Sequence, residues 1–92
     1  MRDHPPVTIR LVYLARLREA FGASDESFRI TEAGGDTVAA LLDSLRLRGG
    51  AYAHELGHGR AVRVAVNHAI ANPGDRLHEG DEVALLPPVT GG

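Results

Sequence analysis

Residues 36–50 read DTVAALLDSLRLRGG and carry the strongest helical pattern in the chain. Apolar side chains recur at i, i+3, i+4 and i+7, the spacing of one face of a helix. These residues are Val38, Leu41, Leu42 and Leu45. Asp36 is the expected N-cap, because its carboxylate can accept hydrogen bonds from the first free amides. Since Gly49-Gly50 ends the pattern, the sequence predicts one amphipathic helix over 36–48.

Strand patterns lie on both sides of this helix. Alternating or apolar runs predict strands over 7–14, 26–31, 61–67 and 82–86. A short helix over 15–21, ended by Gly22, joins the first two strands, and residues 51–56 can add one more helical turn. The order β-(short α)-β-α-β-β is of the α+β class. We expect one main helix packed on a mixed sheet whose first and last strands pair in parallel at its centre.

The apolar positions that share a face define the expected core. In the first strand they are Val7, Ile9, Leu11 and Tyr13. In the rest of the chain they are Phe28, Ile30, Val38, Leu41, Leu42, Leu45, Val62 and Val64. A chain of 92 residues buries only roughly 60–65% of the surface that its unfolded form exposes. A deep, self-contained active-site cleft is therefore not expected.

Composition and charge exclude several classes of function. The chain has ten basic side chains, all arginine, and twelve acidic ones, which gives a net charge of −2. Proteins that bind nucleic acid or an anionic membrane carry clustered positive charge, which this balance does not favour. The chain has no cysteine, which excludes disulfides, thiolate metal sites and a cysteine nucleophile. No apolar run is long enough to span a bilayer, and the first residues lack a signal-peptide pattern. We expect a cytoplasmic protein with neither nucleic acid nor membrane as partner.

The sequence ends in Pro87-Pro88-Val89-Thr90-Gly91-Gly92, directly after the last predicted strand. Proline lacks the amide that a sheet needs, so the strand ends sharply. Glycine has no Cβ, so the Gly-Gly end can pass through a narrow tunnel and present its carboxyl carbon unshielded to a nucleophile. We expect a disordered leader over 1–6, a folded domain over 7–88 and a flexible tail over 89–92.

Together these features resemble the ubiquitin-like β-grasp sulfur carriers, most closely those of the molybdopterin synthase small-subunit (MoaD) type. The likeness covers residues 7–92 and is most specific in Val66-Asn67, in the acidic turn EGDEV over 79–83 and in the segment LLPPVTGG over 85–92. The segment 15–19 with Gly22 is similar to the first helix of the family. Members usually carry aromatic residues before the double proline, where this chain has leucines. The resemblance implies a β-grasp fold.

It also implies a function. An ATP-dependent adenylyltransferase similar to ubiquitin-activating enzymes would adenylate the carboxylate of Gly92, and a sulfur donor protein would convert it to a thiocarboxylate. The tail would then enter the large subunit of molybdopterin synthase and donate sulfur to cyclic pyranopterin monophosphate, forming the molybdopterin dithiolene. The chain would be a non-catalytic subunit of a heterotetramer and would bind no cofactor stably.

The same resemblance implies which residues take part. Gly92 and Gly91 would carry the chemistry. The partner-binding residues would be Leu14, Arg18, Ile70, Leu86, Pro87, Pro88, Val89 and Thr90. For Leu14, Ile70 and Leu86, ordinary packing at a sheet edge is the alternative. An acidic stretch, expected beside the tail, is either a solvated turn or a surface that steers a basic partner. It consists of Asp75, Glu79, Asp81 and Glu82.

Three other interpretations stay open. A sulfur carrier for thiamine thiazole (ThiS type) shares the fold and the Gly-Gly end, although such carriers tend to have less chain than 49–60 provides before the third strand. A ubiquitin-like interaction or conjugation module is also compatible with the fold and the Gly-Gly end. Residues 54–58, HELGH, match the H-E-x-x-H motif of zinc hydrolases. Gly57 and Gly59 weaken a helix there and no third ligand is evident, so a chance match in a polar loop is favoured and no metal is expected.

Overall fold

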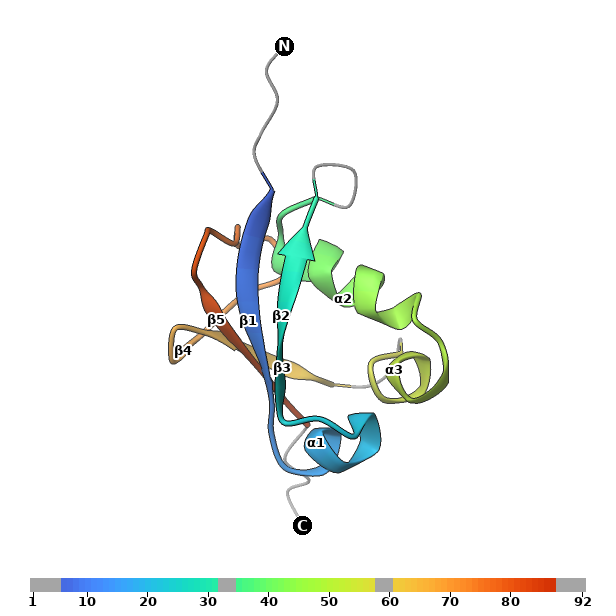
Figure 1. Ribbon diagram of the computed structural model, residues 1–92. Coiled ribbons are helices and arrows are strands. Elements are labelled where there is room, and N and C mark those ends of the chain that lie inside the picture. Colours follow the sequence, from blue (N-terminus) through green and yellow to red (C-terminus); the bar gives the residue numbers. More distant parts are fainter. Residues whose placement is uncertain (1–5, 32–34, 58–60, 88–92) are drawn as a thin grey trace.

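The computed structural model describes residues 6–31, 35–57 and 61–87 (Figure 1). Its strands are β1 (Val7–Tyr13), β2 (Asp25–Ile30), β3 (Arg63–Val66), β4 (Ala69–Ile70) and β5 (Glu82–Leu86). Its helices are α1 (Arg16–Phe21), α2 (Val38–Arg46) and α3 (Gly50–Glu55). The predicted strands and the main helix are all present, with ends that differ from the prediction by at most two residues. None of the helices in the described ranges is long and apolar enough to cross a membrane.

The five strands form one mixed sheet in the order β2-β1-β5-β3-β4. β1 and β5 pair in parallel, from Arg10 opposite Glu82 to Tyr13 opposite Leu85. The other neighbouring strands pair antiparallel. The first and last strands therefore lie side by side at the centre of the sheet, as predicted. In Figure 1 the helix α2 lies against one side of this sheet, and α1 and α3 lie beside its lower end.

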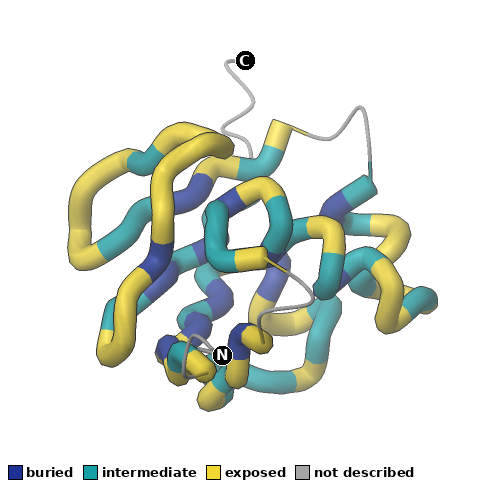
Figure 2. Tube along the Cα trace, turned by 90° about the horizontal axis from the view of Figure 1, so that it is seen from above, coloured by how far each residue is buried: buried dark blue, intermediate teal, exposed yellow. Residues whose placement is uncertain are grey.

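The core lies between the sheet and α2, and Figure 2 shows its buried segments on the inside of the trace. The predicted core residues that are at most 5% exposed are Ile9, Leu11, Tyr13, Ile30, Val38, Leu41, Leu45 and Val64. Four predicted residues are only half-buried and pack at the margin of the core: Val7, Phe28, Leu42 and Val62. Val83 and Leu85 of β5 are fully buried in the core, and Leu17, Leu56 and Leu77, each 1% exposed, complete it from the segments between the main elements.

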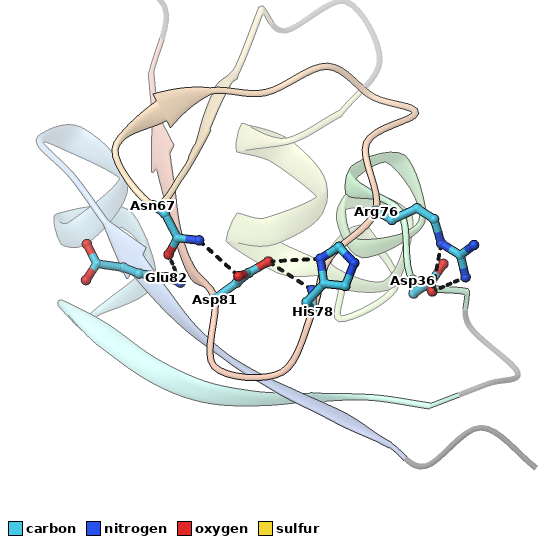
Figure 3. Close-up of polar contacts among 6 residues, drawn as sticks. All are labelled: Asp36, Asn67, Arg76, His78, Asp81 and Glu82. Atoms are coloured by element: carbon cyan, nitrogen blue, oxygen red, sulfur yellow. Dashed lines mark hydrogen bonds and ion pairs between the residues drawn. The ribbon is translucent and has the colours of Figure 1, made fainter.

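The start of α2 differs from the prediction. Its N-cap is Thr37, whose hydroxyl accepts a hydrogen bond from the amide of Ala40 at 3.1 Å. The first two amides of the helix, those of Val38 and Ala39, donate to backbone oxygens of residues 75 and 73 at 3.0 and 2.9 Å. The carboxylate of Asp36 instead accepts from Arg76 at 2.8 Å (Figure 3). The loop before β5 therefore supplies the hydrogen-bond acceptors for the first free amides of α2. A purely local sequence pattern does not reveal these acceptors.

The strand β4 was not predicted. It is only two residues long and forms a hairpin with β3 through Asn67 and His68. Both residues have positive φ, 51° and 73°, as the two central positions of a type I′ turn require. The Asn67 side chain holds this turn to the beginning of β5, because it accepts from the amide of Glu82 at 3.0 Å and donates to Asp81 at 2.9 Å (Figure 3).

A polar cluster joins β1, β2 and the end of α2. Tyr13 is fully buried and donates its hydroxyl to Glu26 at 2.5 Å. Arg48 donates two hydrogen bonds to the same carboxylate, at 2.9 and 3.0 Å. The Arg48 guanidinium holds the pKa of Glu26 below its usual value, and burial raises the pKa of Tyr13. The cluster therefore favours the ionised carboxylate.

Aromatic rings surround this cluster. Phe21 and Tyr52 stack with ring centroids 4.1 Å apart, and Tyr13 meets Phe21 edge-on at 4.8 Å. The Arg48 guanidinium lies 4.8 Å from the centroid of Tyr52 and 5.4 Å from that of Phe28. Because these residues come from two strands and from both small helices, the cluster fixes α1 and α3 beside the end of β1.

Candidate functional site

One face of the sheet presents a continuous apolar surface opposite the core. Side chains alternate between the two faces of a strand, and the buried residues of β1, β3 and β5 define the core face. On the other face Val12 lies opposite Ala84, Ala84 opposite Ala65, and Ala65 opposite Ile70. The first three are half-buried, whereas Ile70 is 64% exposed. We call this the apolar row.

The apolar row extends toward the end of β5. Leu86 follows Ala84 by two residues on the same face and is half-buried. Leu14 is also half-buried and lies at the same end of the sheet, where its amide donates to the backbone oxygen of Leu85 at 3.1 Å. Leu14, Ile70 and Leu86, which the sequence analysis singled out, therefore border one surface, and the two alanines connect them. Whether a partner binds there stays a prediction.

Arg18 lies on α1, close to this end of the sheet. The helix begins after Ala15, whose φ of 52° turns the chain sharply away from β1. Leu17 points into the core and Arg18 is exposed. Gly22, with φ of 72°, ends the helix in the left-handed conformation that glycine favours. Leu17 anchors α1, and Arg18 is exposed to solvent on the same helix.

The residues expected to carry the chemistry lie mostly beyond the described part. Pro87 is half-buried and directly follows β5. Pro88, Val89, Thr90, Gly91 and Gly92 lie outside the described residues, as does most of the leader predicted over 1–6. The structure therefore gives the position from which the tail starts, at the end of β5 next to Leu14 and α1.

Charged residues are distributed unevenly along the sheet. The acidic turn over 79–82 lies at the beginning of β5, about 13 Å from the end of that strand at 3.3 Å per residue. The turn therefore lies at the opposite end of β5 from the point where the tail starts, and its position relative to residues 88–92 stays a prediction because they lie outside the described residues. At the tail end the neighbour of Leu86 across the sheet is Arg63, which is exposed and has no ion pair within the described residues. The sequence analysis missed Arg63 as a site residue.

The possible zinc motif does not form one helical face. α3 ends at Glu55, and the C-cap Leu56 is a core residue. Glu55 lies 3.3 Å from Arg16, and His58 lies outside the described residues. Within the described ranges no three metal-ligating side chains come together. The buried leucine anchors this segment and gives it a structural role.

Two shallow cavities flank α2. One, of about 220 Å³, lies toward β2 and is lined by Phe28, Ile30 and Leu41 among others. The other, of about 200 Å³, lies toward β3 and is lined mainly by aliphatic side chains. Both are smaller than the roughly 300–1,000 Å³ of typical small-molecule sites. The apolar row and the end of β5 are therefore the stronger candidate site, and they suit a protein partner.

The sheet topology and the main helix define a ubiquitin-like β-grasp domain. The sequence model of the ThiS family matches residues 11–92, which include the tail. The chain is 35% identical over 86 residues to the molybdopterin synthase sulfur carrier subunit of Escherichia coli (strain K12), covering 91% of this chain and 99% of that protein. It is 34% identical over 88 residues to the protein of the same name from Mycobacterium tuberculosis, covering 94% and 99%. The chain therefore belongs to the ThiS family.

Solved structures share the fold. The Haloferax volcanii HVO 2177 protein superposes with a TM-score of 0.80 at 27% identity, covering 100% of this chain and 92% of that one. SAMP1 from the same organism superposes with a TM-score of 0.67 at 28% identity, covering 92% of this chain and 99% of that one. A ubiquitin from Caldiarchaeum subterraneum gives 0.57 at 14% identity, covering 96% and 100%, which shows the fold alone. The predicted β-grasp fold and the resemblance to this family are confirmed.

Proposed function

We propose that this chain is the sulfur carrier of molybdopterin synthase. The observation that carries the proposal is the nearly full-length similarity to two proteins of that name, together with a family match that reaches Gly92. The chain would work in the cytoplasm with the large synthase subunit, an adenylyltransferase and a sulfur donor protein. No cofactor would stay bound to it.

The chemistry follows from the reactivity of a terminal carboxylate. A carboxylate is a poor electrophile, so ATP first converts the Gly92 carboxyl group into an acyl-adenylate and releases pyrophosphate. Sulfide supplied by the donor then attacks the acyl carbon and AMP leaves, so that the chain ends in a thiocarboxylate. Inside the large subunit the sulfur forms a bond to cyclic pyranopterin monophosphate, and water cleaves its bond to the Gly92 acyl carbon, which restores the carboxylate. Two such transfers complete the dithiolene. Gly91 adds no Cβ that would obstruct passage of the tail.

Docking on the large subunit would use the apolar row together with Leu14 and Leu86. Leu86 and Leu14 lie at the end of β5, from which the tail starts, and the apolar row crosses β5 two residues earlier, at Ala84. A partner that covers them also receives the tail, so binding and delivery are coupled through one rigid strand. The alanines at the centre of the row leave room for bulkier partner side chains.

The test is the intact mass of the chain after incubation with ATP, a purified adenylyltransferase and a sulfur source. We expect the mass gain for replacement of one oxygen by sulfur, followed by dithiolene formation on addition of the large subunit and its substrate. A C-terminally extended variant is the matched control and should do neither. Product formation by an extended protein verified as unprocessed would exclude the proposal.

A second candidate function is attachment or transfer to another acceptor. The structural similarity to SAMP1, a small archaeal modifier protein, favours a modifier role, and the ThiS family match is also compatible with a carrier for thiamine thiazole. Reaction of the thiocarboxylated chain with the large synthase subunit distinguishes these functions. If sulfur moves only to a thiazole precursor, or the chain becomes joined to protein amines, the molybdopterin assignment is wrong.

A further inference from the structure

A groove runs along the edge of the sheet between α2 and β3. Its apolar walls come from the helix, from β3 and from the segment that follows β4. They consist of Val38, Leu42, Val62, Val64, Ala71 and Pro73. Arg63 and Ile70 also line it, and Arg63 is the only charged residue among these lining residues. The groove therefore offers an apolar floor with a single cation at its margin.

The local chain explains why this groove stays open. β4 ends after two residues, and the last backbone bond to β3 is the one from the amide of Ala71 to the oxygen of Val64, at 2.8 Å. Pro73 has no amide to donate, and its own oxygen accepts from Ala39 at the start of α2. The segment after β4 is therefore held against the helix and does not continue the sheet alongside β3.

The volume and charge of the groove restrict what can bind. Its volume of about 200 Å³ suits one large side chain better than a small-molecule ligand. Arg63 has no ion pair within the described ranges, so a carboxylate next to that side chain would find an available partner. Ile70 belongs both to this groove and to the apolar row, so the two surfaces are continuous.

We infer that the groove between α2 and β3 is a second contact for the protein that receives the tail. It takes one apolar side chain of that partner, and a neighbouring partner carboxylate pairs with Arg63. The inference rests on the proposed function, because the partner is the large synthase subunit. With the apolar row covered on one side and the groove filled on the other, the partner grips the β3–β4 hairpin from two sides.

The test uses the full-length chain, labelled with ¹³C in its alanine, leucine and valine methyl groups, and the unlabelled large subunit. At saturation the methyl signals of Leu42, Val62 and Ala71 should shift, together with those of the apolar row. Leu47, which is 87% exposed beyond the end of α2, is the internal control and should not shift.

The possible outcomes separate the two proposals. Shifts in the apolar row without shifts in the groove would overturn the second contact and leave the proposed function intact. If no methyl group shifts, both proposals fail. Groove shifts that appear when the chain alone is concentrated would mean that a second copy fills the groove, which also overturns the inference.

A matched pair of variants tests the charge. Arg63→Glu should raise the Kd for the large subunit about ten-fold at low salt and less at high salt. Arg29→Glu reverses another exposed arginine, on the far edge strand β2, and should change the Kd less than two-fold. Both chains should keep the unfolding midpoint of the wild type. Equal Kd values for the two variants would exclude a carboxylate partner for Arg63.

Discussion

Replacement of Glu26 by Gln removes the charge at the centre of the Tyr13–Glu26–Arg48 cluster while keeping the shape of the side chain. The ionised carboxylate accepts three hydrogen bonds, one from Tyr13 and two from Arg48. An amide has one oxygen acceptor, so at least the bidentate pair is lost. A hydrogen bond to a charged group contributes about 1.5–3 kcal/mol. Solvent screening reduces the contribution of these hydrogen bonds, because the Glu26 and Arg48 side chains are 28% and 35% exposed.

We therefore expect Glu26→Gln to lower the free energy of unfolding by about 2 kcal/mol at pH 7, and the Tm by about 10 °C. The pKa of Glu26 is lowered in the folded state, and an unfolded glutamate titrates near about 4.3. The stabilisation is therefore complete well above that pH and is lost as pH falls through the folded-state pKa. The difference between wild type and variant should shrink toward pH 3.

Urea unfolding followed by far-UV circular dichroism at pH 7, 5 and 3 measures this difference. Asp43→Asn is the matched control, because Asp43 forms an ion pair with Arg46 on α2 but its side chain is 68% exposed. We expect that control to change the unfolding free energy by less than about 0.5 kcal/mol. An undiminished difference between Glu26→Gln and wild type at pH 3 would refute the reasoning, since packing and not charge would then carry the effect.

Three further predictions concern the cap, the partner and the tail. Thr37→Ala should lower the unfolding free energy by about 1 kcal/mol in urea titrations, because the amide of Ala40 loses its acceptor; Thr37→Ser should restore most of it. Leu86→Asp should leave the Tm nearly unchanged but raise the Kd for the large subunit at least about ten-fold by calorimetry, because it places an unpaired charge in the contact, whereas Ser27→Asp on β2 should not. Deletion of Gly92 should abolish the oxygen-to-sulfur mass gain without moving the Tm by more than about 2 °C, and normal thiocarboxylation of the truncated chain would contradict the assignment.

The sequence was most informative where short-range periodicity and a central position coincide. β1 and β5 alternate because each buries only one face, so their inward residues Leu11 and Leu85 follow from a period of two. The same parity would have indicated Val12, Ala65 and Ala84 as the outward row. These residues are small or only moderately apolar, so residue type alone does not distinguish them from other surface positions. Arg63 was missed for a similar reason, since its importance comes from Leu86 on the neighbouring strand.

Errors arose where distant segments complete a local feature. Asp36 has the chemistry of a helix cap, yet it binds Arg76, forty residues away, and Thr37 caps the helix. The acidic turn precedes the start of the tail by only a few residues, yet the whole length of β5 separates these two points. Leu56 belongs to the core although it lies within a motif that resembles a zinc site.

The sequence alone therefore determined the strands, the main helix and the Gly-Gly tail, because each depends on residue type and spacing within a few residues. The order of these elements gave the α+β class, and the resemblance to a known family implied the β-grasp fold. Tertiary structure alone decided which outward side chains lie opposite one another across the strands, that Arg63 lies next to Leu86, and that a groove opens between α2 and β3. Those features depend on register between strands and on contacts between segments far apart in the chain. Hydrophobic burial fixes them only when the whole domain folds.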